Sequence, residues 1–143
     1  MTGAAVIFPV GADTYAVAAD TVREVVSGPR TTNVPTVAPE LVGALNLRGE
    51  VVPVFDLAAL LGIGTIVDAP FAVVVSTSAG PAGLLVSGLP SVVVLGDEIA
   101  AAELPGTLGA HRVDGGVAVL VDVEALLLPR SDADGPAADL TAR

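Results

Sequence analysis

The side chains able to do chemistry are few in this chain, and they limit what it could catalyse. Its 143 residues include one histidine, His111, no cysteine and no lysine. A catalytic base, a nucleophile and a charge stabiliser would all have to come from Asp, Glu, Ser, Thr and Arg. His111 stands beside Arg112 in a predicted strand, where a half-exposed histidine is ordinary. We therefore predict a protein that is not an enzyme and that holds no metal or cofactor.

Asp56 and Asp122 are two carboxylates whose surroundings match. Each precedes a short apolar run that can bury one face of a helix, at 56–61 and at 122–127. An aspartate in that position accepts a hydrogen bond from a backbone N–H of the first helical turn. Helix capping explains both residues, so they are not interpreted as a catalytic pair.

Arg48 occupies the tip of a predicted hairpin in the stretch GALNLRGEVVPVFDL, residues 43–57. Apolar runs lie on both sides of the Arg-Gly-Glu corner, and Gly49 suits a turn that needs a positive φ. The planar guanidinium matches a carboxylate or the carbonyls of a partner. An exposed arginine is also common at a solvated turn. These residues alone leave both interpretations open.

The composition favours a β-rich fold and excludes some partners. Hydrophobic residues make up 52% of the chain but aromatic residues only 3%, so Val, Leu and Ala must fill the core, and β-branched side chains pack well in sheets. A formal charge of −10 argues against nucleic acid and against an anionic membrane surface, which both attract cations. Strands are predicted at 6–10, 15–19, 51–55, 72–75, 83–86, 92–95 and 117–121.

A tandem repeat organises these elements. When residues 43–61 are shifted by 66 positions, these pairs coincide: Gly43 with Gly109, Gly49 with Gly115, and Asp56 with Asp122. A shift of 67 aligns the upstream strands. The chain therefore divides into two β-rich copies, 1–66 and 67–129, followed by a predicted disordered tail, 130–143. Units this small are marginal alone, so we expect one small barrel per copy and a buried apolar seam between them.

Polar residues that break the repeat are candidates for function, because positions shared by both copies serve the fold that they share. The mismatched pairs are Arg48 with Asp114, Asn46 with Arg112, and Glu24 with Ser91. We therefore expect recognition to depend on the first copy, near the corner that carries Arg48.

The N-terminus gives no sign of export. It has no basic region, and Pro9 and Asp13 interrupt its apolar run. No apolar stretch approaches the roughly 20 residues of a membrane span. A cytoplasmic protein is therefore expected, and the lack of cysteine fits a reducing compartment.

The stretch around Arg48 also carries a resemblance to a known family. Residues 43–57 are similar to the hallmark of the CheW family of chemotaxis coupling proteins, roughly G-x-x-N-L-R-G-x-V-x-P-V-x-D-L, and they fill every fixed position of it. The segment 6–26 resembles the opening strands of the family, and 109–127 resembles its closing segment. The likeness covers about residues 4–128.

The resemblance implies an all-β fold with short helices, in which two pseudo-symmetric five-stranded β-barrel subdomains share an apolar core within one domain, 1–129. It implies a non-enzymatic adaptor that couples the cytoplasmic tips of chemoreceptors to the regulatory domain of a CheA-type histidine kinase. The partner contacts of the family fall here on Arg48 and Glu24, with Asn46 and Val25 beside them.

Two alternatives stay open. One is a CheW-like scaffold in another receptor–kinase pathway, because nothing in the residues identifies the receptor. The other is a small ligand bound between the two barrels, although the predicted seam lacks convergent polar groups. The second copy also departs from the family at Ser87 and Ser91, where relatives often carry acidic residues.

Overall fold

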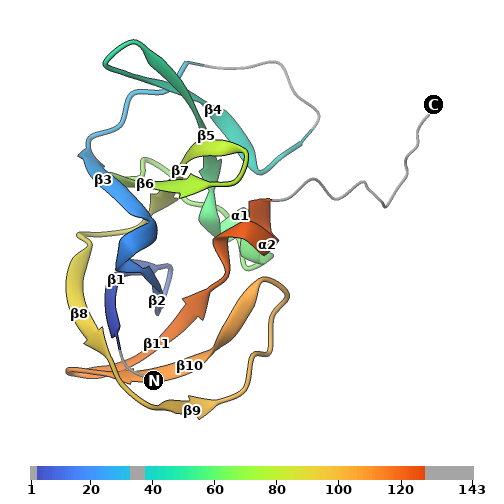
Figure 1. The fold of residues 1–143 in the computed structure, drawn as a ribbon. Coiled ribbons are helices and arrows are strands. Elements are labelled where there is room, and N and C mark those ends of the chain that lie inside the picture. Colours follow the sequence, from blue (N-terminus) through green and yellow to red (C-terminus); the bar gives the residue numbers. More distant parts are fainter. Residues whose placement is uncertain (1–2, 33–37, 128–143) are drawn as a thin grey trace.

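The computed structural model describes residues 3–32 and 38–127, which form strands in two sheets and three short helices (Figure 1). The predicted tail, 130–143, lies outside the described residues. In chain order the elements are β1 (Gly3–Val10), β2 (Asp13–Ala18), the 3-10 helix η1 (Ala19–Thr21), β3 (Val22–Ser27), β4 (Leu41–Leu47), β5 (Glu50–Asp56), α1 (Leu57–Leu61), β6 (Phe71–Thr77), β7 (Gly80–Val86), β8 (Ser91–Leu95), β9 (Glu98–Ala100), β10 (Thr107–Val113), β11 (Gly116–Val121) and α2 (Val123–Leu127).

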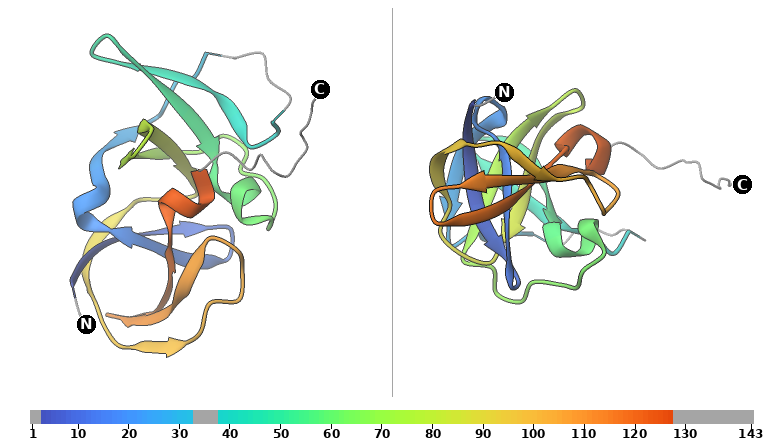
Figure 2. Two further views of the ribbon diagram at one scale, coloured as in Figure 1. Left: turned by 45° about the vertical axis from the view of Figure 1, so that its right-hand side comes forward. Right: turned by 90° about the horizontal axis from the view of Figure 1, so that it is seen from below.

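Two curled sheets around a common core confirm the predicted fold class. Sheet A has the strand order β8-β1-β2-β11-β10-β9, and sheet B has the order β3-β6-β7-β5-β4. The views of Figure 2 show both sheets bending into barrel-like shapes. Sheet A has six strands where five were predicted, because the short β9 adds to its edge by pairing with β10.

The two sheets do not follow the two sequence copies. The opening hairpin of the first copy, β1-β2, lies in sheet A with the last four strands of the second copy. The opening hairpin of the second copy, β6-β7, lies in sheet B with the last three strands of the first. Parallel pairing of β2 with β11 and of β7 with β5 joins the copies. The prediction of one barrel per copy is therefore wrong, because the connections after β2 and β7 cross to the other sheet.

Three apolar clusters fill the fold. The largest lies between the sheets and includes Phe8, Leu57 and Leu84, which are almost fully buried. The cluster inside sheet A consists of Ala5, Ala16, Leu95, Val113 and Ala118. The cluster inside sheet B consists of Leu45, Val52, Val54, Ala72, Val74 and Leu85. The largest cluster is the shared apolar core that the resemblance implied.

Alternation along the strands supplies these clusters. In β6, Val73 and Val75 enter the shared core, whereas Ala72 and Val74 face the inside of sheet B. Successive side chains of a strand point to opposite faces, so a strand that is buried on both faces needs apolar residues throughout. The continuous apolar run of β6 therefore follows from its place between two cores.

Sheet B closes on itself beyond β3. Thr32, which follows β3, and Ala44 of β4 exchange two backbone hydrogen bonds, each 2.9 Å long. The chain passes so close to β4 here that a Cβ on Gly43 would overlap the carbonyl oxygen of Thr32. The register also shifts between Leu41 and Gly43, and such a bulge bends the strand. Gly43 is thus required by the closure of the barrel.

Sheet A uses the same device. The register of β10 shifts between Thr107 and Gly109, the positions equivalent to Leu41 and Gly43. Gly109 has a φ of 118°, and a Cβ there would lie 2.9 Å from the carbonyl oxygen of Ala100 in β9. The repeat therefore preserves both the bulge and the glycine that lets a neighbouring segment approach.

Asp56 and Asp122 cap the two helices, as predicted. The Oδ1 atom of Asp56 accepts a hydrogen bond from the N–H of Ala59, and that of Asp122 from the N–H of Ala125, each 3.1 Å long. Asp56 is buried, and its Oδ2 also accepts a 2.9 Å hydrogen bond from the N–H of Ile66. Asp56 therefore fixes the segment after α1 as well as the start of the helix.

We expect Gly43→Ala to lower the free energy of unfolding by about 1–3 kcal/mol, because the new methyl group pushes the Thr32 segment away from β4. Gly116→Ala is the matched control, since a Cβ at Gly116 meets no atom within 4 Å. Urea unfolding of the two variants measures the difference. Equal stability of the two would contradict the close approach of Thr32 to β4.

We also expect Asp56→Ala to destabilise the protein by about 2–3 kcal/mol and Asp122→Ala by about 1 kcal/mol. The first change removes two hydrogen bonds and leaves the N–H of Ile66 without its acceptor, whereas the second removes only a cap. Chemical unfolding of both variants tests this order. Equal losses would mean that the bond to Ile66 contributes nothing.

Candidate partner-binding site

The β4–β5 turn presents Arg48 in an unusual backbone conformation. Arg48 and Gly49 have φ angles of 52° and 88°, the pattern of a type I′ hairpin turn. Positive φ suits glycine, but a residue with a Cβ is strained there by about 1 kcal/mol or more. In the equivalent turn of the second copy, Gly115 has a positive φ and Asp114 does not. Of these two equivalent turns, only the one that carries Arg48 is strained in this way.

Asn46 holds this turn in place. Its side-chain oxygen accepts a 2.9 Å hydrogen bond from the backbone N–H of Gly49. Arg112, the equivalent residue in β10, has no side-chain oxygen to offer. Asn46, which the resemblance marked as a partner contact, thus has a local structural role in addition to that predicted one.

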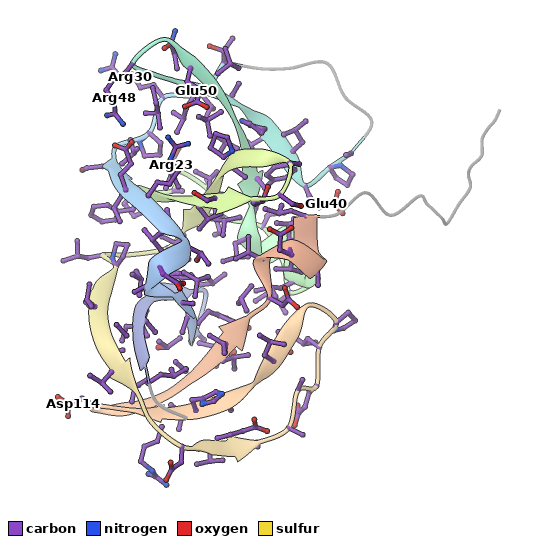
Figure 3. The ribbon with its side chains drawn as sticks, in the orientation of Figure 1. Arg23, Arg30, Glu40, Arg48, Glu50 and Asp114 are labelled. Atoms are coloured by element: carbon purple, nitrogen blue, oxygen red, sulfur yellow. The ribbon has the colours of Figure 1, made fainter. Side chains whose placement is uncertain are left out.

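Arg48 reaches β3 and forms a forked ion pair with Glu24. The Nη2 atom of Arg48 lies 2.5 Å from Oε2 of Glu24, and Nη1 lies 3.4 Å from Oε1. A second ion pair, 3.6 Å long, joins Nη1 of Arg23 to Oε1 of Glu50. Figure 3 shows Arg23, Arg48 and Glu50 gathered at this corner. The fold thus brings together two predicted contact residues that are 24 positions apart.

The two sides of the pair differ in exposure. The side chain of Arg48 is 75% exposed and that of Glu24 is 30% exposed. The hydrogen bond from Arg48 holds the pKa of Glu24 below its ordinary value, and the charges of Arg48 and Arg23 add to this effect. A lowered carboxyl pKa stabilises the fold above the ordinary pKa of glutamate, and that contribution is lost as the pH falls through the lowered value.

These ion pairs join β3 to the β4–β5 turn and to the first residue of β5, across the gap where sheet B closes. β3 forms one edge and β4 the other. An exposed ion pair adds little to stability because solvent and salt screen it, so we assign most of the closure to the backbone bonds between Thr32 and Ala44. The main effect of the fork is to hold the Arg48 side chain in one direction at the tip of the turn.

Apolar surface adjoins the turn. Val25 lies on the outer face of β3 and is exposed, and Val51 follows the turn on β5 and is 69% exposed. A hollow of about 320 Å³ beside the turn is lined by Thr32, Ala44, Leu45, Asn46 and Val51. This corner therefore offers a partner both charge and apolar area.

Arg23, Glu50 and Val51 are residues of this corner that the sequence did not predict. Arg23 and Glu50 have no distinguishing signal, because only the closure of sheet B brings them within 3.6 Å. Val51 did give a signal. Val52 and Val54 are buried, and Val51 precedes them by an odd number of residues. Successive side chains of a strand point to opposite faces, so the exposure of Val51 could have been inferred from the sequence.

The remaining polar candidates have structural roles. The Nδ1 atom of His111 lies 3.0 Å from the carbonyl oxygen of Gly96, which accepts a hydrogen bond when Nδ1 carries the proton. Ser87, where the family often has an acid, accepts a 3.0 Å hydrogen bond from the N–H of Gly11. Within residues 3–32 and 38–127 no group of His, Asp and Glu side chains could hold a metal ion. No helix in these ranges is long and apolar enough to cross a membrane.

The hollow at the seam offers little to a small ligand. It measures about 190 Å³, whereas ligand pockets usually have about 300 Å³ or more. Glu124, one of its carboxylates, already accepts hydrogen bonds from the N–H and the hydroxyl of Ser78, each 2.8 Å long. Asp122 accepts the capping bond from Ala125.

The fold consists of two curled sheets around one apolar core, with an exposed arginine at a strained turn. The family model of the CheW-like domain matches residues 4–129, and the chain belongs to this family. CheW-like domains are non-enzymatic scaffolds.

Comparison with known proteins agrees on the fold. The chain is similar to the crystal structure of the scaffolding protein TtCheW from Thermoanaerobacter tengcongensis, with a TM-score of 0.78 and 22% sequence identity. The match covers 91% of this chain and 95% of that one. A search of curated proteins finds no match.

We expect Arg48→Gly to be more stable than Arg48→Ala by about 1 kcal/mol, because both lose the ion pair but only glycine relieves the positive φ. The matched controls are Asp114→Gly and Asp114→Ala, where the backbone offers no such relief. Urea midpoints of the four variants give the comparison. The strain at Arg48 is disproved if glycine is no better than alanine there.

Proposed function

We propose that this chain is a coupling adaptor that links the cytoplasmic tips of chemoreceptors to the regulatory domain of a CheA-type histidine kinase in bacterial chemotaxis, and that it works in the cytoplasm. Membership of the CheW-like family supports an adaptor role. The observation that carries the proposal is the exposed Arg48 guanidinium, held by Glu24 at a strained turn.

The ion pair with Glu24 preorganises the Arg48 side chain for binding. Its fork with Glu24 uses two N–H groups, and a guanidinium has five donors. The remaining donors are available to a carboxylate or a carbonyl of the partner. Because the ion pair already restricts the side chain, less rotamer entropy is lost on binding.

The surroundings of Arg48 supply the rest of the contact. Val25 and Val51 offer apolar area on the outer surface of sheet B, and Asn46 fixes the turn. Binding then proceeds without chemistry: apolar burial gives affinity, and the charged fork sets orientation and register.

A CheW-like scaffold in another receptor–kinase pathway is the alternative. It uses the same surface and differs in the receptor that it meets. Co-purification of this chain with chemoreceptor fragments and with other receptor tails of the same cell distinguishes the two. If this chain co-purifies with a histidine kinase and a receptor of another class, the alternative pathway is supported and the chemotaxis proposal is wrong.

We expect Arg48→Ala to weaken binding to a receptor tip or to the kinase regulatory domain by about thirtyfold, because truncating an arginine at a desolvated contact commonly costs about 2 kcal/mol. Arg112→Ala is the matched control, since it removes the same charge from the second copy. Calorimetric titration measures the affinities, and circular dichroism checks the fold. Binding that survives Arg48→Ala unchanged contradicts the proposal.

A charge swap separates direct contact from structural support. The double variant Arg48→Glu with Glu24→Arg can rebuild the ion pair with its charges exchanged. If the partner contacts Arg48 directly, each single variant and the double variant all bind weakly. If binding returns in the double variant, the pair acts only by holding the turn, and the docking role of Arg48 is wrong.

A further inference from the structure

A hollow of about 230 Å³ adjoins sheet A and shares no lining residue with the hollow at the seam or with the one beside Arg48. Part of its lining is a row of paired residues across four neighbouring strands: Tyr15 of β2, Val119 of β11, Ala110 of β10 and Ala100 of β9. Asp13 at the start of β2 and residues 101–104, which follow β9, also line it. We call this space the sheet A hollow.

The hydroxyl of Tyr15 faces this hollow without a partner. Tyr15 is only 3% exposed, and no hydrogen bond joins its hydroxyl to another residue of 3–32 or 38–127. Asp13 and Tyr15 line the hollow and Thr14 between them does not, so the hollow lies on the face of β2 to which the Tyr15 side chain points. Burial and the charge of Asp13 raise the pKa of Tyr15. Its hydroxyl therefore keeps its proton at neutral pH and is an unused donor.

The repeat breaks at both polar residues of β2 that line the hollow. At the shift of 67 that aligns the opening hairpins of the two copies, Asp13 falls on Gly80 and Tyr15 falls on Ala82. Both Gly80 and Ala82 lie in β7, the strand equivalent to β2. The fold that the copies share therefore forms without a carboxylate or a phenol at these two positions, and their presence in the first copy needs another explanation.

The charged side chains that line the sheet A hollow are both acidic. They are Asp13 and Glu103, and neither forms an ion pair with the part of the chain that the structure describes. The hydroxyl of Thr107, which also lines the hollow, already donates a 2.7 Å hydrogen bond to the carbonyl oxygen of Leu104. The other side chains are alanines, Leu104 and Val119. Two free carboxylates beside apolar surface suit an ammonium group on a short apolar chain.

Volume and free polar groups together limit the ligand. A cavity of about 150 Å³ is enough to hold benzene, so the 230 Å³ of the sheet A hollow admits a molecule of about that size. The seam hollow differs in its polar groups, because its carboxylates already accept hydrogen bonds from Ser78 and Ala125. In the sheet A hollow a buried donor and two carboxylates are still unused, so a ligand there gains hydrogen bonds that the chain does not make itself.

We propose that the sheet A hollow binds a small amino alcohol, with its ammonium group beside Asp13 and Glu103 and its oxygen accepting the hydrogen bond of the Tyr15 hydroxyl. The short carbon chain between the two groups then packs on Val119 and the neighbouring alanines. An anion is repelled by the two carboxylates, and an amine without an oxygen leaves the Tyr15 donor unpaired. The proposal requires only this chain and is independent of receptor or kinase binding.

Intrinsic fluorescence of the full chain gives a direct test. Tyr15 is the only tyrosine and the chain has no tryptophan, so the tyrosine signal reports on this hollow alone. The ligands are linear amino alcohols from aminopropanol to aminohexanol. We expect a saturable change of the signal, with one chain length bound most tightly. A series that gives no saturable change at millimolar ligand would overturn the proposal.

Two analogues of the best amino alcohol separate its contacts. One is the alkylamine with a methyl group in place of the hydroxyl, and the other is the diol with a hydroxyl in place of the ammonium group. In calorimetric titration we expect each to bind about fivefold more weakly or worse. Tyr15→Phe should lower the affinity for the amino alcohol to that of the alkylamine and leave the alkylamine unaffected. Unchanged binding of the amino alcohol to Tyr15→Phe would mean that only water meets the hydroxyl, and the proposal would be wrong.

The carboxylates have their own matched control. Asp13→Asn should weaken binding of the amino alcohol about tenfold, because it removes a charge-assisted hydrogen bond. Asp20→Asn removes the same charge from an exposed aspartate outside the hollow and should leave the affinity unchanged. Equal losses in both variants would mean that the acidic chain attracts any cation, and the proposed site would be wrong. Asp13 is exposed, so this pair keeps the test valid if Tyr15→Phe folds poorly.

Discussion

The apolar core between the two sheets is the constraint on which the rest of the structure depends. β1 and β6 each serve two cores at once, with alternate residues in the shared core and in the inside of one sheet. A strand buried on both faces needs compact apolar side chains, which explains a chain rich in Val, Leu and Ala with few aromatics. Because the hairpins that line this core are exchanged between the copies, neither copy holds a complete barrel, and the two fold as one unit.

The sequence was sufficient for the fold class and for several local details. The repeat placed the matching turns at Gly49 and Gly115, and the capping rule identified Asp56 and Asp122 correctly, because these features depend on neighbouring residues. The exchange of hairpins could not be predicted, since equivalent strands of the two copies carry equivalent apolar patterns and either partner satisfies them. β9 was missed because it has three exposed residues and owes its existence to pairing with β10.

The sequence named Arg48, Glu24, Asn46 and Val25 as candidate contacts, but it did not indicate the geometry that brings Arg48 and Glu24 together. The family pattern marked Arg48 and Glu24, and the broken repeat marked them independently. Their fork depends on the closure of sheet B between β3 and β4, which brings together residues with no local relation in the sequence. The positive φ of Arg48 and the hydrogen bond from Gly49 to Asn46 belong to a type I′ turn. Such a turn prefers Asn, Asp or Gly at its first central position, so an arginine there gave no signal of this backbone conformation.

The two closing hairpins show which positions the fold constrains. Both keep the bulge, the close-approach glycine and the capping aspartate, because barrel closure and the shared core require them. The first residue of each turn is not constrained in this way, and there the two copies differ: the first copy has Arg48 and the second has Asp114. At Arg48 the divergence runs against stability, since glycine or asparagine would suit the backbone better. The proposed docking role of Arg48 accounts for this choice of residue: the side chain that Glu24 holds is the one that a partner would contact, and the backbone strain is the cost of placing it there.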